Sequence, residues 1–274
     1  MTPVGSHAVI LSTTFSSGQV ELDPTAPIED ARGRFQVATL GYSQSFDLLG
    51  RSASLTMVVP YANGTFSGSV SSVGVEAYRS GLADARVRLA VNLHGGPAMS
   101  VPEYLKWKEK RLISVSVTLS IPTGQYDPAR LVNIGTYRWG IKPEMGFSHR
   151  WGHWVADWYL GAWFFTGNTA YFPGASLRTQ QPALSLEGHW GYYFKPRLWV
   201  SADANFWAGS RSDVNGIPKQ DEQRDSRIGA TVSVPVNRHQ AFKVSYSQGA
   251  YVTVGGAYRT LACGWQYSWI DRPR

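Results

Sequence analysis

The segment from Asp84 to His94 constrains the fold more than any other part of the chain, because its side chains alternate in character without interruption. A period of two is typical of a β-strand with two unlike faces. The polar face carries Asp84, Arg86, Arg88, Ala90, Asn92 and His94, and the other carries Ala85, Val87, Leu89, Val91 and Leu93. One face therefore needs water or charged partners, and the other needs an apolar environment.

A second segment, 113–121, indicates what those two environments are. One of its faces is purely aliphatic, whereas the other carries only serine and threonine. The water-exposed face of a soluble sheet would carry lysine and glutamate instead. The segment therefore favours a strand with lipid on one side and a polar lumen on the other.

The composition agrees with a membrane β-barrel. Only 16% of the 274 residues are charged and 13% are aromatic, whereas soluble domains carry roughly 25% charged residues. No run approaches the ~18 consecutive apolar residues of a membrane helix. A soluble all-β protein with a large core stays open as the alternative on composition alone.

Twelve segments have the pattern or length of strands, and most are long enough for the ~9–11 residues that cross a bilayer. They are residues 7–17, 34–47, 51–61, 82–95, 110–122, 134–149, 153–166, 181–194, 197–208, 225–236, 240–249 and 257–269. The segment 34–47 alternates poorly, and we expect a β-bulge in it. Aromatic residues recur near the segment ends, which predicts two aromatic girdles.

The connections between these segments alternate between long and short. Long ones span 18–33, 62–81, 123–133, 167–180, 209–224 and 250–256, and tight ones span 48–50, 150–152, 195–196 and 237–239. An up-and-down barrel of the outer membrane has long outer loops and short periplasmic turns. An even strand count also places both termini on the periplasmic side. The exception is 96–109, which has a helix-compatible part after Pro102. It could form an amphipathic turn or a plug-like segment on the periplasmic rim, but we favour a solvated turn.

The start of the chain, Met1–Gly5, has neither the basic nor the apolar region of a secretory signal. We expect the natural start to lie upstream, with the signal peptide and a few mature residues missing. The single cysteine, Cys263, excludes an intrachain disulfide and is interpreted as a small buried hydrophobe. The formal charge of +7 comes from basic residues interleaved with acidic ones, which gives nucleic-acid binding little support.

The search for catalytic or metal-binding patterns gives only weak candidates. His149 and His153 are four apart, but they flank a predicted hairpin turn and lack the glutamate of a zincin helix. Asp213, Asn215 and the segment Asp221–Asp225 share one outer loop and could hold a surface divalent cation, although a solvated loop is the simpler interpretation. Ser185, Glu187 and His189 have the residue types of a triad, yet they follow one another on one strand. We therefore predict no catalytic, cofactor or metal site.

Charged and polar residues recur on the predicted inward faces, and we expect them to line the lumen. They are Asp84, Arg86, Arg88, Arg138, Lys142, Glu144, Asp157, Glu187, His189, Asp203, Arg227 and Lys243. For most of them we favour a salt-bridge network that fills and stiffens the lumen. The alternative is that some of them line a solute path. We expect Arg138 or Lys142 to pair with Asp157.

Recognisable motifs occur in six segments of the chain: 80–93, Pro122–Asp127, Asn133–Trp139, Lys142–Glu144, Trp163–Asn168 and Asp225–Ala230. Together they resemble one family, the outer-membrane transporters named for the meta-pathway of phenol degradation. Ala83 stands where the family usually has glycine. The resemblance implies a barrel in the outer membrane of a Gram-negative bacterium that passes aromatic or other hydrophobic compounds. It identifies no ligand site.

We therefore predict an all-β chain whose residues 1–274 form one domain, a 12-stranded antiparallel up-and-down transmembrane β-barrel. Its expected function is passive uptake of small hydrophobic or aromatic compounds without a cofactor. Its expected partners are that solute, outer-membrane lipid and lipopolysaccharide. Three rivals stay open: an outer-membrane hydrolase of lipase type, a structural barrel with a closed lumen, and a soluble β-sandwich.

Overall fold

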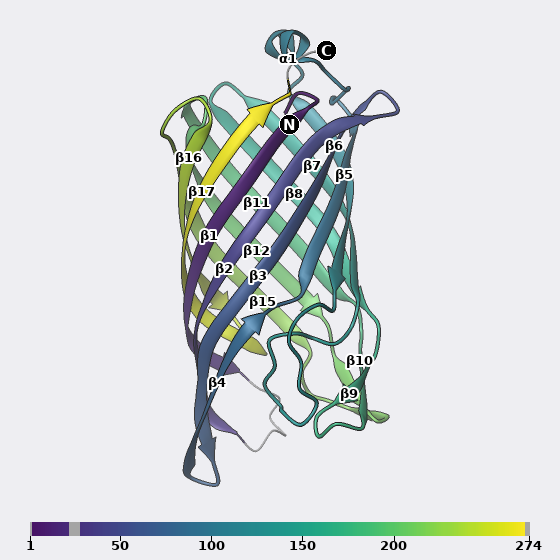
Figure 1. Ribbon diagram of the computed structural model, residues 1–274, viewed down its shortest axis with the longest axis vertical. Helices are drawn as coiled ribbons and strands as arrows, with labels where there is room; N and C mark the ends of the chain where they lie inside the picture. Colours follow the sequence, from purple (N-terminus) through teal and green to yellow (C-terminus); the bar gives the residue numbers. More distant parts are fainter. Residues whose placement is uncertain (1, 22–27, 272–274) are drawn as a thin grey trace.

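Twelve strands close into an antiparallel barrel in the computed structural model, which describes residues 2–21 and 28–271 (Figure 1). Each strand pairs with its neighbours in sequence, and pairing of β2 with β3 completes the closed sheet. The strands are β1 (Ser6–Glu21), β2 (Glu29–Leu48), β3 (Arg51–Val70), β5 (Ala85–His94), β6 (Arg111–Ile121), β7 (Gly140–Trp151), β8 (Trp154–Phe165), β11 (Ala183–Lys195), β12 (Leu198–Gly209), β15 (Gln223–Pro235), β16 (Gln240–Tyr251) and β17 (Gly255–Ile270). The predicted fold is confirmed, since each expected segment overlaps one of them.

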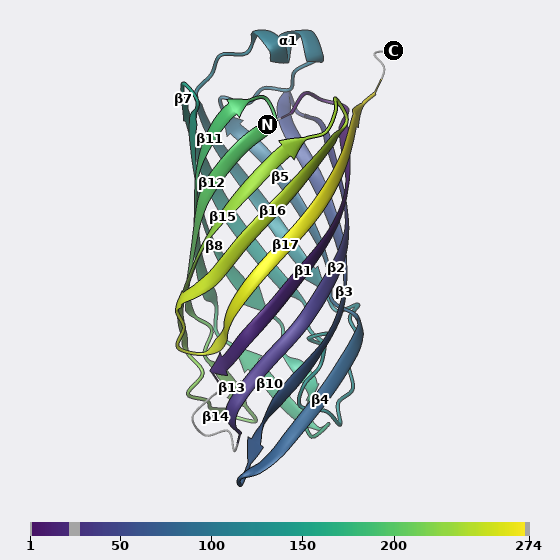
Figure 2. The ribbon, with the colours of Figure 1, turned by 90° about the vertical axis from the view of Figure 1, so that its left-hand side faces the viewer.

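The connections sort onto two ends of the barrel, which we call the short-turn end and the long-loop end. Leu49 and Gly50, both with positive φ, join β2 to β3 at the short-turn end. The N-terminus and the last described residues lie at the same end (Figure 2). The long-loop end carries the connections 122–139, 166–182 and 210–222.

The long-loop end has more secondary structure than the sequence predicted. Residues 62–81, expected as a loop, instead extend β3 and form β4 (Val73–Leu82) in a hairpin that projects beyond the barrel wall (Figure 2). Four short strands make a separate sheet: β9 (Asn168–Tyr171), β10 (Ser176–Gln180), β13 (Ser212–Val214) and β14 (Ile217–Pro218). Hydrogen bonding along the backbone therefore continues past the twelve membrane-crossing segments.

The apolar face of each strand points outward. Leu89 and Val117 stand side by side in the register of β5 and β6, and they are 40% and 42% exposed. Arg88, one residue from Leu89, points inward to Glu144. Among the described residues, the buried hydrophobic side chains are only Ala53, Met99, Ala183 and Ala241, and buried polar ones outnumber them. This arrangement is the reverse of a soluble core and matches a barrel with lipid outside.

Two local expectations were wrong. The segment 34–47 pairs on both sides without irregularity, and the register shift of β2 lies earlier, between Glu29 and Arg32. The poor alternation arises because Phe35 points inward, where its ring meets those of Phe66 and Tyr258. Cys263 is exposed on the outer face rather than buried, because that face meets lipid instead of a protein core.

The connection 95–110 contains a short helix, α1 (Val101–Lys106), where we expected a solvated turn. The Glu103 carboxylate accepts hydrogen bonds from the backbone N–H and the hydroxyl of Ser100, which caps the first turn and lowers the pKa of Glu103. The indole of Trp107 donates to the Gly95 carbonyl. Figure 1 shows α1 beyond the short-turn end. No helix among the described residues is long and apolar enough to cross a membrane.

Candidate functional site

A chain of alternating charges follows the inner wall from β5 to β11. The guanidinium of Arg88 lies 2.9 Å from Glu144, and the ammonium of Lys142 lies 2.5 Å from the other oxygen of Glu144. The same ammonium lies 2.7 Å from Glu187. The register explains this contact set, because Thr118 of β6 pairs with both Arg88 and Lys142 and keeps them on the same face. Each of these four charged side chains on the inner wall therefore has an opposite charge beside it.

A second polar cluster continues around the wall on β11, β12 and β15. The Nδ1 of His189 lies 2.7 Å from the carboxylate of Asp203. Asp203 also accepts hydrogen bonds from the hydroxyls of Ser201 and Thr231. The Asp203 carboxylate therefore has three hydrogen-bond partners on the inner wall, His189, Ser201 and Thr231.

The three residue types of a triad do not assemble. Ser185 donates to Glu187, whereas His189 bonds to Asp203 one strand away. No hydrogen bond joins Ser185 to His189 in the described part of the chain. A serine nucleophile needs its base within hydrogen-bond reach, so this arrangement gives the hydrolase hypothesis no support.

Three cations of the inner wall have polar or aromatic neighbours instead of carboxylates. Arg227 donates to the hydroxyls of Ser247 and Thr260. The ammonium of Lys243 lies 5.8 Å from the centre of the Trp199 ring, and Arg86 lies at the same distance from the Trp163 ring. None of the three makes an ion pair with another residue in 2–21 or 28–271.

Two of these cations line a cavity of about 490 Å³ in the lumen. Its wall includes Val155, Asp157, His189, Tyr193, Trp199, Ser201, Asp203, Asn205, Arg227, Thr231, Lys243 and Ser245. Tyr193 and Trp199 face each other across the β11–β12 pair with ring centres 6.0 Å apart. The cavity therefore combines an aromatic wall, two cations without carboxylate partners, the carboxylates of Asp157 and Asp203, and several hydroxyl groups.

The predicted ion pair of Asp157 with Arg138 or Lys142 was wrong. Lys142 pairs with Glu144, two residues along the same strand, and with Glu187 of β11, whereas Asp157 lies opposite Ser148, six residues farther along β7. Arg138 lies outside the strands, since β7 begins at Gly140 rather than at residue 134, and its guanidinium stacks 4.3 Å from the centre of the Phe165 ring. Burial lowers the pKa of Arg138 to about 10, and its Nη1 has no hydrogen-bond partner among the described residues.

Asp84 also has a role that the sequence did not suggest. It lies between β4 and β5 and is only 8% exposed. Its carboxylate accepts hydrogen bonds from the backbone N–H of Gly124, at 2.9 Å, and from the N–H and hydroxyl of Thr136. Gly124 and Gly135 pack backbone to backbone, where a Cβ on either would meet the other at 2.6 Å. Asp84 therefore fixes the fold of the connection 122–139.

The acidic metal candidates and His153 hydrogen-bond to protein groups, whereas the Nδ1 of His149 has no hydrogen-bond partner among the described residues. The carboxylate of Asp221 accepts hydrogen bonds from Ser212, and that of Asp225 accepts from the backbone N–H and hydroxyl of Thr253. The Nδ1 of His153 bonds to the carbonyl of Tyr193. Within residues 2–21 and 28–271, no group of three or more histidine, cysteine, aspartate or glutamate side chains is placed to hold a metal ion.

Comparisons with known proteins agree with this architecture. The model of the family named for the MetA-pathway of phenol degradation matches residues 23–265. The COG4313 outer membrane channel from Pseudomonas putida F1 has a similar fold, with a TM-score of 0.82 at 16% identity over 98% of this chain and 97% of that chain. The KdgM porin in complex with disordered oligogalacturonate gives a TM-score of 0.52 at 9% identity over 95% and 99%. No curated protein sequence gives a significant match.

The closed twelve-stranded barrel, its apolar exterior and its polar interior define an outer-membrane protein of a Gram-negative bacterium with the fold of channels and porins. The family model matches residues 23–265, which is most of the chain. The chain belongs to the family named for the MetA-pathway of phenol degradation.

Proposed function

We propose that this protein is a passive channel for small aromatic compounds, in particular those that carry an acidic group. The observation that carries the proposal is the lumen cavity beside Trp199, where Lys243 and Arg227 face it without carboxylate partners. A cation that lacks a protein anion favours an anionic solute, and an aromatic wall favours a flat ring. Membership of a family associated with phenol degradation supports the same class of solute.

The proposed orientation places the short-turn end in the periplasm and the long-loop end outside the cell, as in other outer-membrane barrels. A solute would enter past the connection 122–139 and leave near α1. The surrounding lipid at the long-loop end would then be lipopolysaccharide. Transport down a concentration gradient needs no cofactor, so binding in the cavity must stay weak enough to permit release.

The test is flux into liposomes that contain the refolded protein. We expect benzoate to enter faster than benzylamine, which has the same ring and the opposite charge, and faster than lactate, which lacks the ring. Lys243→Gln should lower benzoate flux about fivefold, the effect of losing about 1 kcal/mol at the site. Arg34→Gln on the outer face of β2 removes a positive charge away from the cavity and should leave the flux unchanged. Equal flux for all three solutes would contradict the proposal.

A closed structural barrel is the second candidate, and the charge chain from Arg88 to Glu187 favours it. Paired charges that fill the wall could block the bore without any solute path. This candidate predicts neither ion conductance nor solute flux in the same liposomes. The hydrolase hypothesis would require lipase activity that Ser185→Ala and His189→Ala both abolish.

A further inference from the structure

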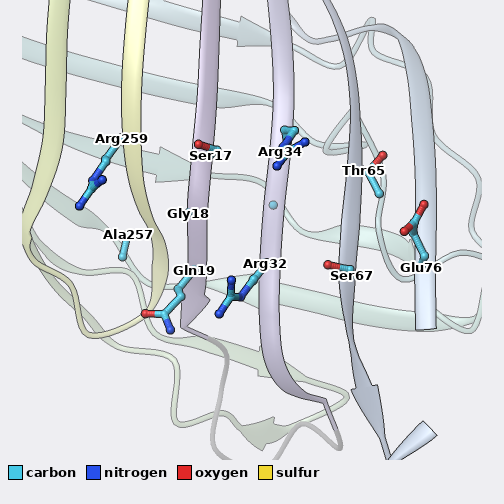
Figure 3. Close-up of a pocket in the computed structure, with 11 residues that line it drawn as sticks. Ser17, Gly18, Gln19, Arg32, Arg34, Thr65, Ser67, Glu76, Ala257 and Arg259 are labelled. Carbon is cyan, nitrogen blue, oxygen red and sulfur yellow. The ribbon is translucent and has the colours of Figure 1, made fainter. Parts of the chain in front are cut away.

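The outer surface of the barrel carries three arginines at the long-loop end, on β2 and β17, the two strands that flank β1; we call Arg32, Arg34 and Arg259 the arginine patch. Ser17 of β1 pairs with Arg34 on one side and with Arg259 on the other. Adjacent strands are ~4.8 Å apart, so the backbones of Arg34 and Arg259 lie about 10 Å apart, with Ser17 between them. Arg32 lies two residues from Arg34 and shares its face. Figure 3 shows Arg32 and Arg34 on the strand beside Ser17 and Gln19, with Arg259 on the other side of that segment.

The patch faces away from the lumen. Phe15, two residues before Ser17, is 48% exposed, and Leu261, two residues after Arg259, is 44% exposed. Because side chains two apart on a strand share a face, the arginines stand on the same outer face as these lipid-facing residues. The opposite face in this region carries Tyr258 and Phe35, whose rings touch each other inside.

The patch lies at the edge of the apolar band. Phe15, Leu261 and Leu40 belong to the exposed apolar surface that continues toward the short-turn end. Beyond the patch, β1 ends at Glu21 and β17 begins at Gly255. The arginines therefore stand at the level where acyl chains give way to lipid headgroups.

The patch has little negative charge of its own. None of the three arginines makes an ion pair within the described parts of the chain. Glu76 lines the same groove, but it pairs with Ser67 on β3, which separates it from Arg32 on β2. The groove has a volume of about 750 Å³, and Ser17, Gln19, Thr65 and Ser67 supply further hydrogen-bonding groups.

We propose that this groove binds the phosphorylated diglucosamine headgroup of a lipopolysaccharide molecule. Arginine forks pair with phosphate through two parallel hydrogen bonds, and the hydroxyl and amide groups between them suit a sugar. The acyl chains of the same molecule would lie on the apolar band beside Phe15 and Leu261. This inference rests on the proposed orientation, in which the long-loop end meets the outer leaflet.

The test is native mass spectrometry of refolded protein in detergent, with Kdo2-lipid A as the probe. We expect a retained one-to-one adduct with the wild type and affinity lower by about tenfold or more in the R32Q/R34Q/R259Q variant. The K106Q/K108Q/R111Q variant removes the same charge at the short-turn end and should bind as the wild type does. Equal binding by the two variants would overturn the proposal.

Three further ligands are tested on the wild-type protein, so that the result does not depend on whether the arginine variant folds correctly. Lipid A without its phosphates should lose the affinity that the arginines provide, and equal binding of this lipid would overturn the proposal. Phosphatidylglycerol and inorganic phosphate should bind more weakly than Kdo2-lipid A, and equal affinity would mean a general anion patch instead. Benzoate flux through the R32Q/R34Q/R259Q variant should match the wild type, so loss of flux and loss of lipid binding can be told apart.

Discussion

The ammonium of Lys142 on β7 reaches the carboxylate of Glu187 on β11, at 2.7 Å, across the intervening strand β8. Gly161 of β8 permits this contact, because a Cβ at that position would meet the Lys142 Cε at 3.0 Å and the Pro143 carbonyl at 2.8 Å. The glycine therefore opens the inner wall at the one point where the side chain of Lys142 crosses it. The ion pair ties together two strands that do not touch through their backbones.

Replacing Lys142 with methionine should destabilise the barrel by about 3 kcal/mol. The substitution leaves Glu187 without its cation and Glu144 with Arg88 alone, and uncompensated buried charges are costly. Urea unfolding in detergent, followed by tryptophan fluorescence, measures the change. Lys106→Met on the exposed helix should stay within about 0.5 kcal/mol of the wild type. A Lys142→Met barrel as stable as this control would show that the charge chain contributes nothing.

Replacing Asp84 with alanine should loosen the connection 122–139. The substitution removes the acceptor of three hydrogen bonds from Gly124 and Thr136, which we expect to cost about 1–3 kcal/mol in local stability. Limited trypsin digestion detects the effect, because Arg130 lies exposed within this connection. Cleavage after Arg130 should become faster in the variant. An unchanged cleavage rate would mean that other contacts hold the connection.

Replacing Leu89 with arginine should destabilise the barrel in lipid by about 2–4 kcal/mol, the cost of a cation on the lipid face near the bilayer midplane. Leu89→Met keeps the surface apolar and serves as the matched control. Equilibrium unfolding in phospholipid vesicles measures both. If the arginine variant is as stable as the methionine variant, Leu89 does not face acyl chains.

The alternation of side chains predicted which residues face outward and which face the lumen, because a period of two fixes the face of each residue wherever a strand runs straight. Leu89 and Val117 lie where that rule places them. The rule failed at Thr136 and Arg138, where alternating residues belong to a connection held by Asp84. Local sequence could not show this, because the partner of Thr136 lies fifty-two residues away.

The pairing of inward charges was harder to predict than their presence. Strand order makes β7 and β8 neighbours, which suggested that Lys142 would reach Asp157. The register instead places Glu144 and Glu187 nearer, and Gly161 leaves the space that the lysine side chain needs. The arginine patch was missed for another reason. Its three members belong to β2 and β17, near opposite ends of the sequence, and these strands come to lie on either side of β1 only when the barrel closes.

The most direct test of the account is the reaction of adjacent cysteines on β16 with a charged, membrane-impermeant thiol reagent. The structure places Ser245 on the wall of the lumen cavity and Val244 on the lipid face, where it pairs with Cys263. In a Cys263→Ser background and in membranes, Ser245→Cys should react rapidly and Val244→Cys should resist, as the native Cys263 should in the wild type. Rapid labelling of Val244→Cys with protection of Ser245→Cys would contradict a polar lumen enclosed by a lipid-facing wall.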